Sequence, residues 1–212
     1  MRQPEAETLG KDGNSRKMKI PLTAVILAGG QSLRMGSDKA SLRLGQCSLL
    51  ERQTQIARQA GAGSVLISLA RPRDGFPFPT VIDHRPNCGP LAGLEAGLSV
   101  CSTPLLLLLA VDLPEISFEF LGKLIQGCSP TLGRIPSWGD RSEPLAAVYP
   151  RCLLSLVERH LNADRFAMRD LVAAGHDAGM LAPFPVTPAE QYLFTNWNKP
   201  EDWNEVMSSS PS

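Results

Sequence analysis

The sequence has no excess of positive charge. Its 212 residues include 21 Lys and Arg against 21 Asp and Glu, so the formal net charge is zero at pH 7. Proteins that bind nucleic acid through general phosphate attraction present a basic surface, and no nucleic-acid partner is therefore expected here. A site for a small polyanion needs only a local group of cations, so overall neutrality does not exclude one.

Cysteine and histidine are scarce, with five Cys and three His in the whole chain. No CxxC pair occurs, and the spacings support no zinc cage. An odd number of widely scattered cysteines favours a reducing compartment, where each serves as a small apolar side chain. They are Cys47, Cys88, Cys101, Cys128 and Cys152. We therefore expect a cytoplasmic protein.

Long apolar runs are missing as well. The longest, residues 105–111, is far below the ~20 residues of a membrane-spanning helix, and the first residues lack the apolar segment of a secretory signal. No membrane partner is expected. The 43% apolar content is ample for one core. We predict a single domain over residues 21–207, a disordered N-terminal extension at 1–20 and a disordered tail at 208–212.

Short apolar runs alternate with helical patterns along the chain. Strands are predicted at 23–28, 65–69, 80–82, 105–111 and 145–149. Helices are predicted at 48–60, 91–100, 117–127, 151–161 and 165–174, with a last one from Pro200. The unbroken run 105–111 is typical of a central parallel strand covered on both faces. The pattern predicts the α/β class, with one doubly wound, mostly parallel sheet.

The segment after the first predicted strand carries the most information about ligands. It reads Leu27-Ala28-Gly29-Gly30-Gln31-Ser32-Leu33-Arg34-Met35-Gly36-Ser37-Asp38-Lys39. Open α/β sheets bind ligands at the carboxyl ends of strands, and glycines there let the backbone turn its N–H groups toward an anion. Arg34 can add a planar fork of donors and Lys39 a compact charge. These features predict a triphosphate site.

Two common phosphate motifs do not fit this segment. The P-loop requires a lysine directly after its second glycine, whereas Lys39 follows Gly36 by three residues. The dinucleotide fingerprint requires Gly-x-Gly, whereas the chain has adjacent Gly29 and Gly30. Neither a P-loop ATPase nor a dinucleotide-binding enzyme is indicated.

The pattern LAGG-x-S-x-RMG-x-DK resembles the opening signature of the molybdenum cofactor guanylyltransferases (MobA), members of the Rossmann-like nucleotidyltransferase superfamily. The resemblance implies transfer of GMP from GTP to the molybdenum-molybdopterin cofactor, with Mg²⁺ and release of pyrophosphate. It implies nucleotide contacts from Leu27, Ala28 and Gly29 at the guanine end, from Gly30, and from Arg34 and Lys39 on the phosphates. Arg34, Lys39 and Asp112 are the implied catalytic residues.

Two further segments match the family in order. Asp83 and Gly89-Pro90-Leu91-Ala92-Gly93 resemble the Asp and GPLAG elements that line the nucleotide pocket, although small residues such as Gly93 and Gly97 would also suit a helix packed tightly on a sheet. Asp112 follows the run 105–111 and resembles the family's metal aspartate. Mg²⁺ is commonly held by one or two carboxylates plus substrate phosphates. The alternative role for Asp112 is a helix N-cap.

The acceptor side is predicted from the second half of the chain. Pro144 and Leu145 resemble the family's PL-x-A-x-Y element, which on its own would be an ordinary edge strand. Arg169 lies in a segment that resembles an Arg-rich helix, and surface charge is the alternative reading. Asn196 and Asn198 precede Pro200-Glu201-Asp202 and resemble the closing N-x-N-x-PED element, in which helix capping is the alternative.

The chain departs from the family at Ser68-Leu69-Ala70-Arg71, where many members carry a nucleotide-contacting Asn, and that contact is not transferred. The alternatives are a related nucleotidyltransferase that uses CTP or a sugar-phosphate acceptor, and a non-catalytic nucleotide- or cofactor-binding relative. The Leu27-Ala28-Gly29-Gly30 turn favours GTP. Expected partners are GTP and the molybdenum-molybdopterin cofactor, with cofactor-biosynthesis or molybdoenzyme chaperone proteins as candidates, and a monomer or weak oligomer is expected.

Overall fold

The computed structural model describes residues 20–28, 43–44, 47–73, 75–85 and 87–196. The predicted helix from Pro200 and the predicted tail at 208–212 lie outside these residues, as do residues 1–19 of the predicted extension. Ile20 packs against the core. The division into one domain over 21–207 with two disordered ends stays a prediction.

One mixed sheet forms the centre of the molecule. Its parallel part runs in the order β5 (Thr80–Ile82), β4 (Ser64–Leu69), β1 (Leu22–Leu27), β6 (Leu105–Ala110). The other side of β6 continues through β9 (Ala146–Pro150), β7 (Gly133–Trp138) and β10 (Leu181–Pro185), and β8 (Arg141–Ser142) pairs with β7. A separate ribbon of β2 (Arg43–Leu44) and β3 (Cys47–Ser48) precedes the first helix.

The chain order of the parallel strands reverses between β1 and β6. From β1 the chain moves outward to β4 and β5, then crosses to β6 on the other side of β1. In open α/β sheets, ligands bind in the crevice at the carboxyl ends of strands where the order reverses. The carboxyl ends of β1 and β6 therefore mark the place for the site.

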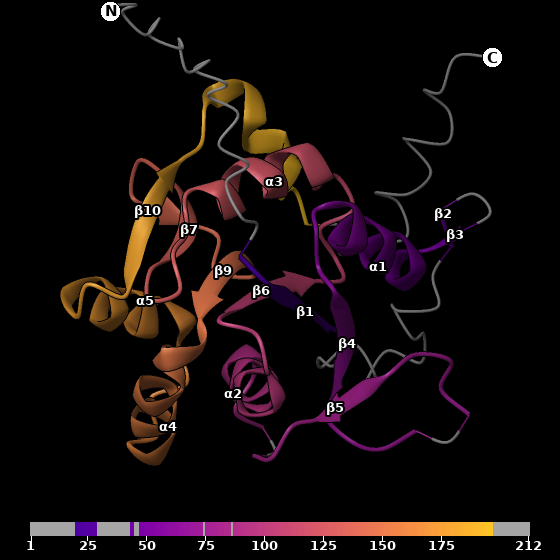
Figure 1. Ribbon diagram of the computed structural model, residues 1–212, viewed down its shortest axis with the longest axis horizontal. Helices are drawn as coiled ribbons and strands as arrows, with labels where there is room; N and C mark the ends of the chain where they lie inside the picture. Colours follow the sequence, from indigo (N-terminus) through magenta and orange to yellow (C-terminus); the bar gives the residue numbers. More distant parts are fainter. Residues whose placement is uncertain (1–19, 29–42, 45–46, 74, 86, 197–212) are drawn as a thin grey trace, which may run out of the picture.

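Helices cover both faces of the sheet, as Figure 1 shows. One face packs against α1 (Leu49–Gln59), α3 (Phe118–Gln126) and η4 (Pro188–Phe194). The other packs against α2 (Pro90–Val100), α4 (Leu154–Asn162), which follows η3 (Arg151–Leu153), and α5 (Met168–Asp177). The two faces form two apolar clusters, so the predicted doubly wound α/β sheet is confirmed.

Strand β9 departs from the prediction. It lies between β6 and β7, runs antiparallel to both, and all five of its residues are buried. The interpretation of this segment as an ordinary edge strand is therefore wrong. The run 105–111 is central and covered on both faces as predicted, but it has a parallel neighbour only on the β1 side.

Local signals explain where the helices start. Ser48 and Glu51 form a reciprocal capping box at the start of α1, and Ser117 caps α3 by accepting from the Phe120 N–H at 3.2 Å. Helix α5 begins at Met168 rather than at the predicted residue 165. Its N-cap is Ala167, whose side chain makes no capping bond, so no capping residue marks this start.

Gly97 on α2 lies against the sheet. An added Cβ would lie 2.7 Å from Val25 Cγ2 on β1 and 3.0 Å from Leu106 Cδ1 on β6, closer than packed side chains allow. Both neighbours are fully buried strand residues, and Val25 is β-branched and stiff. The small residue is therefore explained by packing of helix on sheet.

We expect Gly97→Ala to lower the free energy of unfolding by about 1–3 kcal/mol, because overpacking a dense core forces neighbours to move. Gly122→Ala is the matched control on α3, where a new Cβ meets nothing within 4 Å. That change should be neutral or stabilise by up to about 1 kcal/mol. Urea unfolding of both variants gives the comparison, and equal stability of Gly97→Ala and the wild type would contradict the packing explanation.

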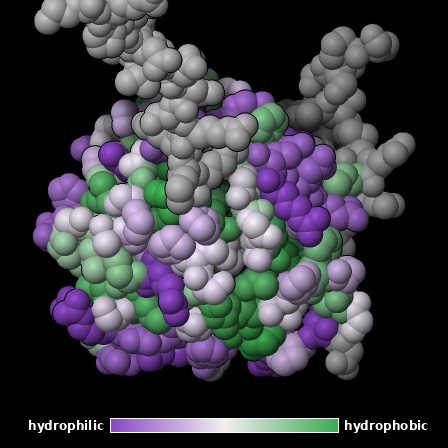
Figure 2. Space-filling view, in the orientation of Figure 1, coloured by the Kyte–Doolittle hydropathy of each residue, from purple (hydrophilic) through white to green (hydrophobic). Residues whose placement is uncertain are grey.

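Large exposed hydrophobic side chains are scattered along the described part of the chain. The large exposed hydrophobic residues Val100, Phe118, Phe166 and Tyr192 come from four separate segments. On the face seen in Figure 2, hydrophobic residues gather low in the centre and hydrophilic residues lie around them. Among the residues that the structure describes, no helix is both long enough and apolar enough to cross a membrane.

Candidate functional site

The carboxyl ends of β1, β4 and β6 bring predicted site residues together. The Ala28 N–H donates to the Ser68 carbonyl at 3.3 Å, and the Val111 N–H donates to the Leu27 carbonyl at 3.3 Å. Leu27 and Ala28 thus lie beside the backbone that leads into Asp112. The structure joins these three residues at the reversal of strand order, as the ligand-site prediction requires.

Asp112 emerges into a short loop between β6 and α3. Its side chain is half-buried. The N-cap of α3 is Ser117, five residues later, so helix capping does not explain Asp112. Within the described parts of the chain, no hydrogen bond or ion pair engages its carboxylate.

Asp83 follows β5 and is held by its neighbour strand. The Ser68 hydroxyl donates to Asp83 Oδ1 at 2.7 Å, and the Asp83 N–H donates to the Leu69 carbonyl at 3.0 Å. Burial raises the pKa of Asp83 above its ordinary value, and the Ser68 hydroxyl and the charge of His84 lower it in part. Ser68 therefore orients the carboxylate of Asp83, which is predicted to bind the nucleotide. Ser68 lies where the chain departs from the family pattern.

The Gly89-Pro90-Leu91 segment forms the start of α2. Gly89 has φ 63° and ψ −153°, a conformation almost restricted to glycine, and Pro90 is the first helical residue. Both residues are exposed. The Leu91 side chain is fully buried in the core, so a nucleotide contact there would come from its backbone. An added Cβ at Gly93 would lie 2.5 Å from Leu27 Cδ2, which shows how closely α2 packs behind the site.

Glu143 is a candidate site residue in addition to those predicted from the sequence. Leu109 pairs with Ala146, and the Ala110 N–H donates to the Leu145 carbonyl at 2.7 Å. Continuing this antiparallel register places Glu143 opposite Asp112. The Leu145 N–H donates to Glu143 Oε1 at 2.9 Å, which fixes the side chain. The carboxylate just before Pro144-Leu145 was the signal available in the sequence.

Burial raises the pKa of Glu143, the Leu145 N–H lowers it in part, and the charge of Asp112 raises it again. When the pKa of a carboxyl is higher in the folded chain than in the unfolded chain, the fold loses stability as pH rises. The loss begins at the unfolded-state pKa, 4.5 for this group, and continues through the folded-state pKa. In metal-free buffer, the wild type should therefore lose stability from pH 5 to pH 7.5 through this group, whereas Glu143→Gln should not. The free energy of unfolding of the variant relative to the wild type should rise over this range. Urea unfolding at both pH values tests this, and a pH-independent difference would contradict it.

The predicted acceptor residues are only partly brought together. Pro144 and Leu145 lie at the same sheet edge, where the Tyr149 hydroxyl donates to the Pro144 carbonyl at 2.7 Å. Asn196 is exposed just after η4, whose Phe194 stacks on Trp138 at the carboxyl end of β7. Arg169 lies in the first turn of α5, its side chain 87% exposed and 3.4 Å from Asp170. No contact within the described parts of the chain links Arg169 to the other site residues.

Five predicted site residues lie outside the described residues. They are Gly29, Gly30, Arg34, Lys39 and Asn198. Their roles stay predictions.

The donor set at the edge suits a hard divalent cation. Asp112 and Glu143 offer carboxylate oxygens, and Mg²⁺ typically takes one or two carboxylates and completes its shell with water and substrate phosphates. Within the described ranges no group of three or more His, Cys, Asp or Glu could hold a metal ion. The two carboxylates match the pattern of a cation that also binds substrate phosphates.

Comparison with known proteins gives consistent matches. Residues 24–178 match the family model described as the MobA-like NTP transferase domain. A probable molybdenum cofactor guanylyltransferase from Opitutus terrae is 37% identical over 186 residues, covering 85% of this chain and 92% of the relative. A molybdenum cofactor guanylyltransferase from Xanthomonas euvesicatoria is 33% identical over 195 residues, covering 92% and 98%.

Solved structures share the fold. The molybdopterin-guanine dinucleotide biosynthesis protein A from Archaeoglobus fulgidus superposes with a TM-score of 0.69 at 21% identity, over 89% of this chain and 100% of that one. A Mycobacterium tuberculosis protein in complex with manganese superposes with a TM-score of 0.60 at 18% identity, over 90% and 100%. At these identities the structures establish the common architecture.

Proposed function

This chain belongs to the MobA-like NTP transferase family, and from that membership we propose that it is a molybdenum cofactor guanylyltransferase. It transfers GMP from GTP to the molybdenum-molybdopterin cofactor and releases pyrophosphate. The observation that carries this function is the position of Asp112 beside Leu27 and Ala28 at the reversal of strand order. The match to this chain covers 92% and 98% of two relatives named for this activity.

The reaction joins two anions. A terminal phosphate oxygen of the cofactor attacks the α-phosphorus of GTP, a new phosphoanhydride bond forms, and the bond to the β-phosphate oxygen breaks so that pyrophosphate leaves. The attacking oxygen is already anionic near neutral pH, so no general base is needed. The protein's task is to align the two phosphates and to offset their charge.

Arg34 and Lys39 bind the triphosphate in this scheme, and Asp112 would hold a Mg²⁺ ion. When bound, the ion would supply charge stabilisation for the phosphoryl transfer. Its use is supported by the two half-buried carboxylates of Asp112 and Glu143 and by the manganese complex of a protein of the same fold. Asp83, oriented by Ser68, and the backbone of Gly89-Pro90-Leu91 line the nucleotide side.

The acceptor is bound by Pro144, Leu145, Arg169, Asn196 and Asn198 in this proposal, of which Pro144 and Leu145 are best supported because they lie opposite the Asp112 loop. The protein acts in the cytoplasm as a monomer or weak oligomer. Cofactor-biosynthesis or molybdoenzyme chaperone proteins are its proposed protein partners.

Base choice gives the first test of this function. Thermal shift of the full chain with GTP, CTP and ATP, each with Mg²⁺, should show the largest rise in melting temperature with GTP. A larger rise with CTP would instead support a cytidylyltransferase of the same fold. No shift with any of the three nucleotides would contradict nucleotide binding.

A further inference from the structure

Helix α1 reaches across the face of the sheet to the loop that carries Asp112. The Gln53 Nε2 amide donates to the Leu113 carbonyl at 2.6 Å, and the Arg52 Nε donates to the Pro114 carbonyl at 2.8 Å. The two acceptors are the residues directly after Asp112. Two consecutive carbonyls of the loop therefore accept hydrogen bonds from two consecutive side chains of α1, a helix far from the loop in sequence.

Gln53 is a polar residue in a fully buried position. It is 0% exposed, on the helix face that also buries Leu50 and Ala57, and its Oε1 atom has no hydrogen-bond partner among the described residues. A buried amide with one unsatisfied atom costs free energy, whereas a methionine of similar length would pack without that cost. The favourable contact that Gln53 makes with its polar group is the bond to the Leu113 carbonyl.

The consequence for Asp112 is geometric. One hydrogen bond would let the loop pivot, but two bonds to successive carbonyls fix both its position and its rotation. The capping box of Ser48 and Glu51 stabilises the N-terminus of α1. The backbone directly after Asp112 is thereby held in place by helix α1.

We propose that Gln53 and Arg52 are positioning residues that hold Asp112 for the divalent cation. This rests on the proposed metal role of Asp112. Partners that orient a metal ligand from outside its coordination shell typically contribute 10–100-fold to metal affinity or activity. The two side chains act on the cation through the backbone next to its ligand.

The test measures binding without turnover. Calorimetric titration of the full chain gives the Kd for GTP with and without Mn²⁺, and the ratio of the two is the metal contribution. In Gln53→Met we expect this ratio to fall about tenfold or more, with the metal-free Kd unchanged. Gln55→Met is the matched control, because Gln55 is exposed on the same helix, and it should keep the wild-type ratio.

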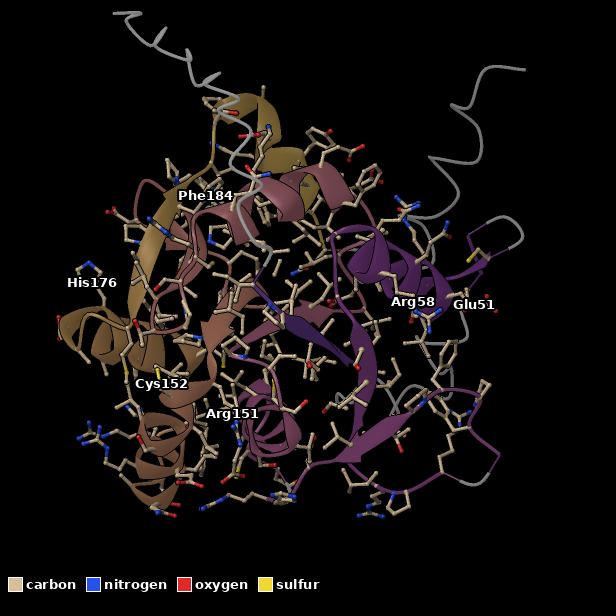
Figure 3. All side chains as sticks on the ribbon, in the orientation of Figure 1. Glu51, Arg58, Arg151, Cys152, His176 and Phe184 are labelled. Carbon is tan, nitrogen blue, oxygen red and sulfur yellow. The ribbon has the colours of Figure 1, made fainter. Side chains whose placement is uncertain are left out.

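Arg52→Met provides a second variant, because Arg52 is only half-buried and its loss threatens folding less. Its control is Arg58→Met, at the exposed position labelled near the end of α1 in Figure 3. We expect Arg52→Met to lower the metal contribution severalfold and Arg58→Met to leave it intact.

A merely structural role predicts a different outcome. Gln53→Met and Arg52→Met would then melt at lower temperature but keep the full metal contribution, which would overturn the positioning role alone. A wild-type chain whose affinity for GTP does not respond to Mn²⁺ would overturn the metal role of Asp112 together with this proposal. If Gln53→Met fails to fold, the result with Arg52→Met decides.

Discussion

Replacing Asp112 with alanine is expected to remove Mg²⁺-dependent pyrophosphate release. Asp112 emerges where the strand order reverses, beside Leu27 and Ala28, and none of the described helices uses it as a cap. Charge stabilisation by a bound cation is worth several kcal/mol in a transition state, which corresponds to roughly 10³-fold or more in rate. Initial rates over a Mg²⁺ titration measure the effect.

Asp112→Asn sharpens this prediction, because it keeps the size of the side chain and removes its charge. Glu115→Gln is the control, since Glu115 is a half-buried carboxylate on the same loop with no assigned role. We expect the first variant to lose the metal response and the second to keep it. An unchanged Mg²⁺ titration in Asp112→Asn would contradict the metal role.

Lys39→Ala is expected to lower turnover by a factor on the order of 10²–10³, the usual effect of losing a preorganised electrostatic donor. The reaction brings two phosphates together, and the lysine of the LAGG-x-S-x-RMG-x-DK signature offsets charge that builds up between them. Lys39→Arg keeps the charge but not the compact ammonium, so it should recover activity only in part. Steady-state rates at saturating GTP and cofactor give the comparison.

Lys123→Ala is the control for Lys39→Ala. Lys123 is exposed on α3 and pairs with Glu190 at 3.2 Å on the surface, so its removal should leave turnover unchanged. A folded Lys39→Ala protein with wild-type turnover would contradict the assignment of the first loop to the triphosphate.

The first half of the sheet could be predicted from the sequence because its strands are unbroken apolar runs. The run 105–111 contains β6, and the short runs at 65–69 and 80–82 became β4 and β5. Capping residues marked two of the helices in the same way, since Ser48 and Ser117 precede α1 and α3. Local chemistry decides these elements.

Strands β7 and β10 could not be found from local pattern. β7 contains Gly133, Arg134 and Pro136, and β10 contains two prolines, which disfavour strands in general. β10 tolerates them as an edge strand, where one side needs no ladder bonds. The direction of β9 was equally hidden, because burial of both faces is the same for parallel and antiparallel neighbours.

The site shows the same limit. Asp83 and Asp112 follow apolar runs and were identifiable as carboxylates at strand ends. Glu143 precedes its strand, so its position opposite Asp112 depends on the antiparallel pairing of β9 with β6. The attachment of Gln53 to Leu113 joins residues 60 apart in sequence and follows from packing of α1 against the sheet.

The central claim is guanylyl transfer to the molybdenum-molybdopterin cofactor. Pyrophosphate release by the full chain should be measured with loaded cofactor and Mg²⁺, using GTP, CTP and ATP in turn, with the organic product identified by mass. We predict release with GTP in strong preference to the other two, in equal amount to a guanine dinucleotide product. Release with CTP in preference to GTP, or none with any nucleotide, would contradict the claim.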